Sequence, residues 1–244
     1  NEMTIYIEAC ESGSMFDSIL ESNINIYATT AANPHESSWG WYCHPQDMVQ
    51  GKHIGSCLGD EYSITWMEDS DSHDVCKETV GEQFDSVQKA VVKSHVMEYG
   101  QTTFKDEVIG NFQGVCDAKS PVETMLKQTQ RRAVEAREDS GVMSRDIKMH
   151  HLFYKYMESQ AEEDRIAMEA ELKSRNAIET RFYLLRDTAG ITFEEKPVVQ
   201  DFDCYKALID QYVETCGSDE YDLGFFHNFV SLCNASMESN AALS

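Results

Sequence analysis

The chain has 244 residues, 43 of them acidic and 20 basic, which gives a formal net charge of −23 at pH 7. This charge argues against nucleic acid as a partner, and no apolar run reaches the roughly 20 residues of a membrane-spanning helix, so we expect no membrane either. The length and a hydrophobic content of 41% allow one large domain or two smaller ones. Because many carboxylates share one chain, its properties should depend on pH.

The first motif lies at residues 5–14, where an apolar, β-branched segment leads into Cys10 and a run of small residues. Apolar residues at helical spacing follow at 15–20. Strand, exposed residue, turn and helix is the order in which α/β enzymes present a nucleophile, and a helix N-terminus favours a thiolate. A small buried cysteine at a strand end fits the spacing equally well.

Residues 23–32 predict a second strand. With the first strand and the helix near Phe16 it forms a βαβ unit, which implies a parallel sheet. The loop 33–40 leaves the carboxyl end of its strand at the same sheet edge as Cys10. This loop is therefore a candidate binding wall.

Residues 41–60 form an irregular excursion between Cys43 and Cys57, which a disulfide could close. We interpret His44 and His53 within it as solvated loop histidines rather than metal ligands. The chain has neither a CxxC motif nor a zinc-like Cys/His spacing, so we expect no structural zinc and no other cofactor.

The remainder of the first half carries both strand and helix patterns. Alternating apolar residues predict a strand over 61–69, helical spacing predicts a helix over 79–92, and 94–100 predicts a short strand that ends at Gly100. His95, within that strand, is interpreted as a hydrogen-bonded core or edge histidine.

After Pro121 the composition favours helices, which we place at 122–138, 144–159, 161–186, 201–216 and 221–233. Cys204 and Cys233 fall in separate helices, which a disulfide could join. The fold class is therefore α/β, with an incomplete parallel-sheet domain (1–118) followed by an all-α domain (119–244). Because the chain enters a strand almost at once after Asn1, we expect that the N-terminal part of the protein is missing.

Several ordered stretches resemble the legumain family, the asparaginyl endopeptidases or vacuolar processing enzymes. They lie at 6–14, 27–34, 36–39, 58–60, 66–70 and 94–100. More weakly, 145–156 and the spacing of Cys204, Cys216 and Cys233 resemble that family's C-terminal prodomain. The resemblance covers nearly the whole chain, and it favours Cys10 as a nucleophile over a buried cysteine.

The resemblance implies a caspase-like fold and a cysteine endopeptidase that cuts after Asn, and less well after Asp, mainly at acid pH. Cys10 would attack the scissile carbonyl as a thiolate, and its backbone N–H would form part of the oxyanion hole. The family's histidine base lies further upstream of the cysteine than this sequence reaches. None of the eight histidines present is therefore assigned that role.

The resemblance also implies a specificity pocket at Glu8, Ser38 and Asp60. An asparagine side chain offers two N–H donors and an acceptor oxygen. The two carboxylates would accept the N–H groups, and an arginine from outside this chain would meet the oxygen. Without that arginine, the two acids would repel each other and raise one pKa. Trp39 would line a neighbouring substrate subsite, although a core aromatic fits its position almost as well.

The helical part would be a prodomain that inhibits its own peptidase domain at neutral pH and is released by acid. Family members are activated by cleavage after Asn or Asp in the linking segment. Since no Asn lies between Phe112 and Arg175, the cleaved residue would be Asp117, Asp139 or Asp146.

The resemblance further pairs Cys204 with Cys233 and Cys216 with a later cysteine. It places the protein in a lysosome or vacuole, or outside the cell, acting on peptides or proteins with Asn at the cleavage site. The alternatives are a peptide ligase using the same site, and an inert fragment or pseudoenzyme whose helical domain binds or inhibits an active relative. Because the expected base lies outside the sequence, we predict that these residues alone have no peptidase activity.

Overall fold

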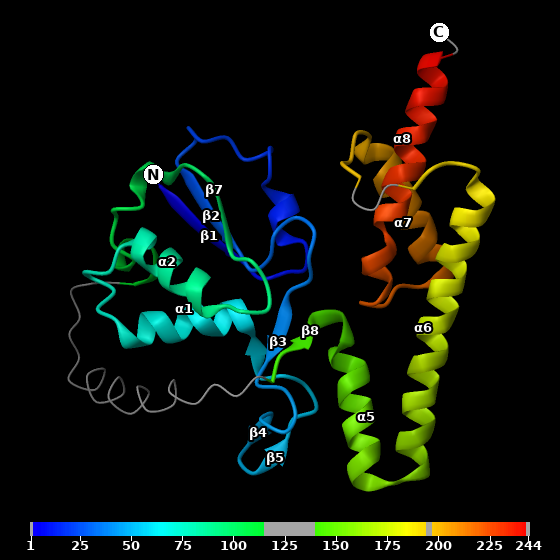
Figure 1. The fold of residues 1–244 in the computed structure, drawn as a ribbon, viewed down its shortest axis with the longest axis horizontal. Helices are drawn as coiled ribbons and strands as arrows, with labels where there is room; N and C mark the ends of the chain where they lie inside the picture. Colours follow the sequence, from blue (N-terminus) through cyan, green and yellow to red (C-terminus); the bar gives the residue numbers. More distant parts are fainter. Residues whose placement is uncertain (1, 115–139, 194–196, 243–244) are drawn as a thin grey trace. The chain divides into compact units, whose positions relative to one another are not determined.

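The computed structural model describes residues 2–114, 140–193 and 197–242. They divide into two compact units, Asn1–Ile147 and Lys148–Ser244, the first mixed α/β and the second helical (Figure 1). The domain boundary expected between 118 and 119 lies outside the described residues, and 140–147 belong to the first unit. None of the described helices has the length and apolar character needed to span a bilayer.

The main sheet of the first unit has the strand order β1-β2-β7, with β1 at Met3–Ile7, β2 at Ile26–Thr30 and β7 at Met97–Gly100. β1 and β2 pair in parallel and β7 pairs antiparallel to β2. The strands predicted in the first segment, over 23–32 and over 94–100, and the parallel pairing of the first two, are therefore confirmed. The carboxyl ends of β1 and β2 lie at one sheet edge, which carries both Cys10 and the loop 33–40.

The helix predicted over 15–20 is wrong. A short 3₁₀ helix, Ser12–Met15, is followed by turns, and Ser18 lies in the left-handed region with φ of 58°. Met15 and Ile19 are 55% and 63% exposed. Because a short helix depends on a buried apolar face, this stretch lacks the packing that would hold one.

The strand predicted over 61–69 is also wrong, because these residues begin helix α1 (Glu61–Ser72). The alternation of Tyr62, Ile64 and Trp66 suits a strand, but Tyr62 and Trp66 are also four residues apart and share one helical face. Both pack in the core with helix α2 (Val80–Ala90). An apolar pattern this short fits both the period of a strand and the period of a helix, so packing in the core decides which of the two forms.

The helix predicted over 79–92 is confirmed as α2. Its N-terminus is fixed by a capping box between Thr79 and Glu82. α1 and α2 run side by side (Figure 1), and Tyr62 packs against Phe84 and Val87 beneath the main sheet. This layer supports the sheet edge that carries Cys10.

A second, small sheet has the order β6-β3-β8, with β3 at Trp39–Trp41, β6 at Gly59–Asp60 and β8 at Val142–Met143. A hairpin of β4 (Met48–Val49) and β5 (Lys52–His53) lies between β3 and β6. The predicted Cys43–Cys57 disulfide closes this excursion. After β7 come a 3₁₀ helix, Thr102–Phe104, and the short α3, Gly110–Gln113.

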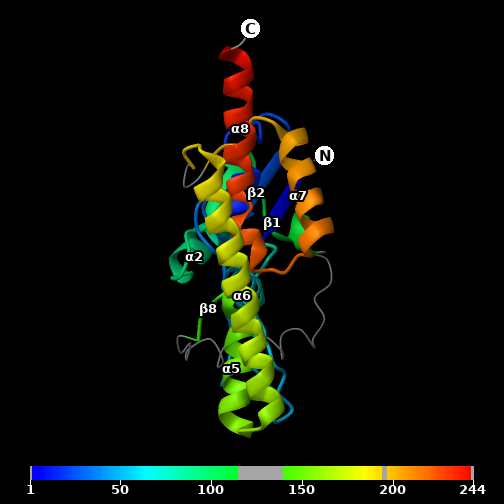
Figure 2. The ribbon, with the colours of Figure 1, turned by 90° about the vertical axis from the view of Figure 1, so that its right-hand side faces the viewer.

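The second unit contains α5 (Ile147–Ser159, which begins at the last residue of the first unit), α6 (Glu162–Ala189), α7 (Phe202–Cys216) and α8 (His227–Ala242). Four of the predicted helices are thereby confirmed, while 122–138 lies outside the described residues. Ion pairs of Lys148 with Glu171 and of Lys155 with Asp164 tie α5 to α6 as a hairpin (Figures 1 and 2).

The core of the second unit lies where α6 meets α7 and α8. Ile178 and Phe182 of α6 pack against Phe226 and Phe229. The predicted disulfide between Cys204 of α7 and Cys233 of α8 is present, and Cys216 is a free, exposed thiol. The bridge and the aromatic cluster together hold these three helices.

Replacing both Cys204 and Cys233 by Ser should destabilise the second unit. The bridge spans a sequence separation of 29 residues, and freeing a loop of this size in the unfolded chain lowers the unfolding free energy by about 3 kcal/mol. Chemical denaturation followed by the helical circular dichroism signal measures the change. Cys216→Ser is the matched control and should leave the midpoint unchanged, so an equal loss in both variants would contradict the prediction.

Candidate active site

The turn that carries Cys10 is fixed to the carboxyl end of β2. Glu11 adopts a left-handed conformation with φ of 51°. Its backbone N–H donates to the carbonyl of Glu36 at 2.7 Å, and the N–H of Gly13 donates to the carbonyl of Ala32 at 3.0 Å. Two segments from different strands therefore hold the thiol in place.

The small residues after Cys10 are required by close packing. Ser12 is fully buried, and its hydroxyl bonds both the N–H and the carbonyl of Ala32. A Cβ on Gly13 would lie 2.5 Å from the Tyr99 hydroxyl and 2.8 Å from the Pro34 ring. The 3₁₀ helix here has only four residues, so the expected activation of Cys10 by the dipole of a following helix is not supported.

Cys10 and Ser38 lie together, as the sequence predicted. The Cys10 thiol is free and partly buried, and its Sγ lies 3.5 Å from Oγ of the buried Ser38. Ser38 in turn hydrogen-bonds Ser144 with an Oγ–Oγ distance of 3.0 Å. A free thiol and two hydroxyls therefore lie together near the start of β3.

Glu8 and Asp60 are two partly buried carboxylates that interact electrostatically. Oε2 of Glu8 accepts the backbone N–H of Ser63 at 2.8 Å, while no residue in the described part of the chain donates to its buried Oε1. Burial, reinforced by the charge of Asp60, raises the pKa of Glu8 to about 7, and burial raises the pKa of Asp60 as well. The pair suits a ligand that supplies N–H donors.

Trp39 is the first residue of β3 and is half-buried. It pairs in register with Met143 of β8, and the Lys93 ammonium lies 5.4 Å from the centre of its ring. Its proximity to Ser38 is as expected, and its subsite role stays a prediction.

Sequence reasoning missed the role of Arg145. Its guanidinium forms a bidentate ion pair with Glu11, at 2.6 and 3.1 Å, and donates to the Ser37 hydroxyl. Although burial lowers the pKa of Arg145, the hydrogen-bonded Glu11 carboxylate and the electrostatic interaction with Cys10 raise it further, so the net shift is upward. The segment Val142–Asp146 is thus held along β3, beside the Cys10 turn, and its sequence alone carries no signal of this contact.

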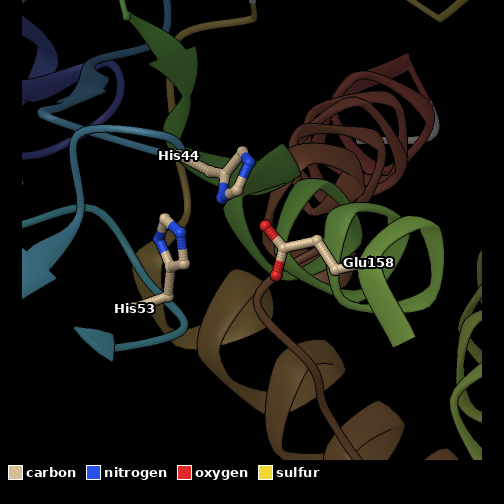
Figure 3. Close-up of side chains that lie close together, drawn as sticks. All are labelled: His44, His53 and Glu158. Carbon is tan, nitrogen blue, oxygen red and sulfur yellow. The ribbon is translucent and has the colours of Figure 1, made fainter. Parts of the chain in front are cut away.

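No histidine of the first unit forms a hydrogen bond with Cys10 among the described residues. His95, expected to be bonded, pairs with Glu36 at 2.8 Å. His44 and His53 stack with ring centres 4.5 Å apart (Figure 3), and His53 bonds the buried Asp47, so they are not simply solvated. Glu158, drawn in the same view, belongs to the second unit and is not counted with them.

Comparisons with known proteins identify the family. Residues 1–115 match the model of the peptidase C13 family, and residues 185–244 match the model of the legumain prodomain. The chain belongs to the legumain family. The motif resemblance is thereby confirmed, and the family is one of cysteine peptidases.

The similar relatives are plant enzymes. The chain is 33% identical over 251 residues to vacuolar-processing enzyme beta-isozyme 1 of Oryza sativa, covering 96% of this chain and 50% of the relative. It is 32% identical over 266 residues to the delta-isozyme of Arabidopsis thaliana (100% and 56%). It is 31% identical over 258 residues to legumain of Canavalia ensiformis (96% and 53%). The chain thus spans about half the length of the curated relatives it matches.

Glu8→Gln should change how stability depends on pH. Because the folded-state pKa of Glu8, about 7, lies above its ordinary value of 4.5, the folded chain binds this proton more tightly than the unfolded one. The unfolding free energy contributed by Glu8 is greatest at acid pH, falls as pH rises from about 4.5 to about 7, and is level above.

Glutamine removes that loss, so we expect the variant to be more stable than the parent by about 1–3 kcal/mol at mildly alkaline pH and equal to it at acid pH. Denaturant titrations of both proteins across the pH range measure the difference. The exposed Glu2→Gln is the control and should follow the parent throughout. If the stability of Glu8→Gln differed from that of the parent by the same amount at every pH, protonation of Glu8 would be ruled out as the cause.

Proposed function

We propose that this chain carries the nucleophile and part of the specificity pocket of an endopeptidase that cleaves after Asn, and less well after Asp. The observation that carries the proposal is the contact of the free Cys10 thiol with Ser38, in a chain of the legumain family whose Glu8, two residues before the thiol, interacts with Asp60. A pocket next to a thiol can bind a substrate side chain while the adjoining carbonyl reaches the sulfur.

The reaction follows from the chemistry of a thiol. The Cys10 thiolate adds to the scissile carbonyl, the amine leaves with a proton, and a thioester remains. Water then releases the acid and regenerates the thiol. A histidine outside these 244 residues supplies the base, as the family resemblance implies. An amine in place of water would give the ligase reaction, which uses the same intermediate.

The acidic pocket accounts for the choice of Asn. The NH₂ group of an asparagine side chain donates two hydrogen bonds, and Glu8 Oε1 is a buried acceptor that receives none within the described residues. An aspartate side chain would place a third carboxylate there unless it were protonated. Cleavage after Asp is therefore restricted to acid pH.

The segment Val142–Asp146 acts as an intramolecular inhibitor. β8 pairs with β3, Ser144 donates its N–H to the Ser38 carbonyl at 3.1 Å, and Arg145 binds Glu11 next to the nucleophile. A peptide substrate aligned on β3 competes for the same edge. These contacts support synthesis as a zymogen, and the high acidic content of the chain supports release in acid, because protonation changes the overall charge.

A lysosome or vacuole suits this behaviour. The pocket acids weaken the folded state as pH rises, and similar proteins are named vacuolar-processing enzymes. An acidic compartment stabilises the folded state around these acids.

Activity should require Cys10 and respond to the pocket acids. In the full-length enzyme, Cys10→Ala abolishes hydrolysis of an Asn-containing peptide after acid activation, whereas Cys216→Ala leaves it unchanged. Asp60→Asn lowers kcat/KM for the Asn peptide by about tenfold or more, since a hydrogen bond to a charged acceptor is lost. Mass spectrometry of the products locates the cut.

The same assay separates the alternatives. Hydrolysed product alone, in the presence of an added amine nucleophile, excludes the ligase. An inactive full-length protein favours the pseudoenzyme. These 244 residues tested alone should be inactive, so turnover that depends on Cys10 in the isolated chain would contradict a base supplied from elsewhere.

Arg145→Ala should release the inhibitory segment. Loss of a bidentate ion pair worth about 1.5–3 kcal/mol raises the peptidase activity of the uncleaved precursor at neutral pH by about tenfold or more. Arg165→Ala, which removes an exposed ion pair on α6, is the matched control. Equal activity in both variants and the parent would show that the segment does not block the site.

A further inference from the structure

A second group of chemically reactive side chains lies at the end of α1. Nδ1 of His73 is 3.3 Å from Oδ1 of Asp69 and 3.5 Å from Oε1 of Glu78. The three ligand atoms lie within 4.8 Å of one another. Asp69 belongs to α1, His73 ends that helix, and Glu78 directly precedes the capping residue of α2.

Burial makes this group unusual. Glu78 is only 8% exposed, yet its Oε2 receives no hydrogen bond from the described residues, and the same holds for Oδ2 of Asp69. His73 lies near one oxygen of each carboxylate, so one buried oxygen of each remains without a donor, which is costly. A proton or a cation shared by the two carboxylates would offset this cost.

The two carboxylate oxygens lie further from Nδ1 of His73 than a hydrogen bond requires, while the same nitrogen is at hydrogen-bond distance from the Asp69 carbonyl (3.0 Å) and the Ser72 hydroxyl (3.2 Å). Nitrogen–oxygen hydrogen bonds are about 2.7–3.2 Å long, whereas two ligands of a tetrahedral zinc ion are about 3.3–3.5 Å apart, given bonds of about 2.0–2.2 Å. The Asp69 backbone carbonyl, 3.0 Å from the same Nδ1, adds an oxygen at the negative end of the helix dipole. The His73 side chain is half-exposed and gives an ion access from solvent.

We propose that Asp69, His73 and Glu78 form a binding site for a divalent cation of the zinc class. Two carboxylates and an imidazole suit Zn²⁺, whereas Ca²⁺ and Mg²⁺ favour oxygen ligands in larger number. The ion joins the end of α1 to the start of α2, and so stabilises the helical layer beneath the main sheet. Zinc-like spacing of Cys and His could not predict it, because two of the ligands are carboxylates.

The test measures zinc binding directly. A Cys10→Ser, Cys216→Ser parent removes the free thiols, which bind zinc themselves. After treatment with a chelator, the protein is titrated with Zn²⁺ at neutral pH against a chromogenic competitor, and Tm is recorded in parallel. We expect saturation at one equivalent, a rise in Tm, and no comparable rise with Ca²⁺ or Mg²⁺.

Ligand variants assign the site. Asp69→Asn, His73→Ala and Glu78→Gln should each weaken Zn²⁺ binding by about tenfold or more. Asp71→Asn changes an exposed acid on the same helix and should bind as the parent does. A His44→Gln, His53→Gln variant should also bind normally, which separates this site from the stacked loop histidines.

Two outcomes overturn the proposal. In the first, Zn²⁺ binding is absent or survives all three ligand variants. In the second, Glu78→Gln raises Tm while the parent binds no metal. Asp69 and Glu78 then share only a proton, which agrees with the pKa of Glu78, raised to about 8 by burial and by Asp69. If the variants fail to fold, Co²⁺ added to the parent decides, because a tetrahedral site gives a visible absorption band that Zn²⁺ abolishes.

Discussion

The structure of the catalytic edge depends on two backbone hydrogen bonds that join the Cys10 turn to the end of β2. Glu11 donates to Glu36 and Gly13 donates to Ala32. Because Glu11 is left-handed, the chain reverses directly after the thiol and the side chain of Cys10 faces Ser38. A helix after the cysteine is not needed, since the neighbouring loop fixes the turn.

In the proposed function, carboxylates take part in both recognition and its control. One buried carboxylate oxygen of Glu8, near Asp60, receives no hydrogen bond from the described residues, while Glu11 binds Arg145. Acid relieves the repulsion between Glu8 and Asp60, so the folded state around these two carboxylates is most stable at acid pH.

The parts of the fold that sequence could predict are those with local signals. Strands β1 and β2, the capped helix α2 and the helices of the second unit follow from composition and period, while the roles that motifs assign to Cys10, Ser38, Glu8 and Asp60 stay predictions. α1 was mistaken for a strand because its apolar alternation is too short to define a period. Arg145 could not be found, since its partner Glu11 lies 134 residues away in sequence and only folding joins them.

The proposed Asp69–His73–Glu78 site shows why a cluster with two carboxylates escapes sequence analysis. Asp69 and His73 are four residues apart on a helix, but a chain with 43 acidic residues contains such pairs by chance. This pair differs from the others because it lies next to the buried Glu78. Glu78 belongs to the loop between α1 and α2, and its burial cannot be predicted from the spacing of residues in the sequence. Charge patterns therefore become evidence for a site only when folding removes a carboxylate from water without supplying its donors.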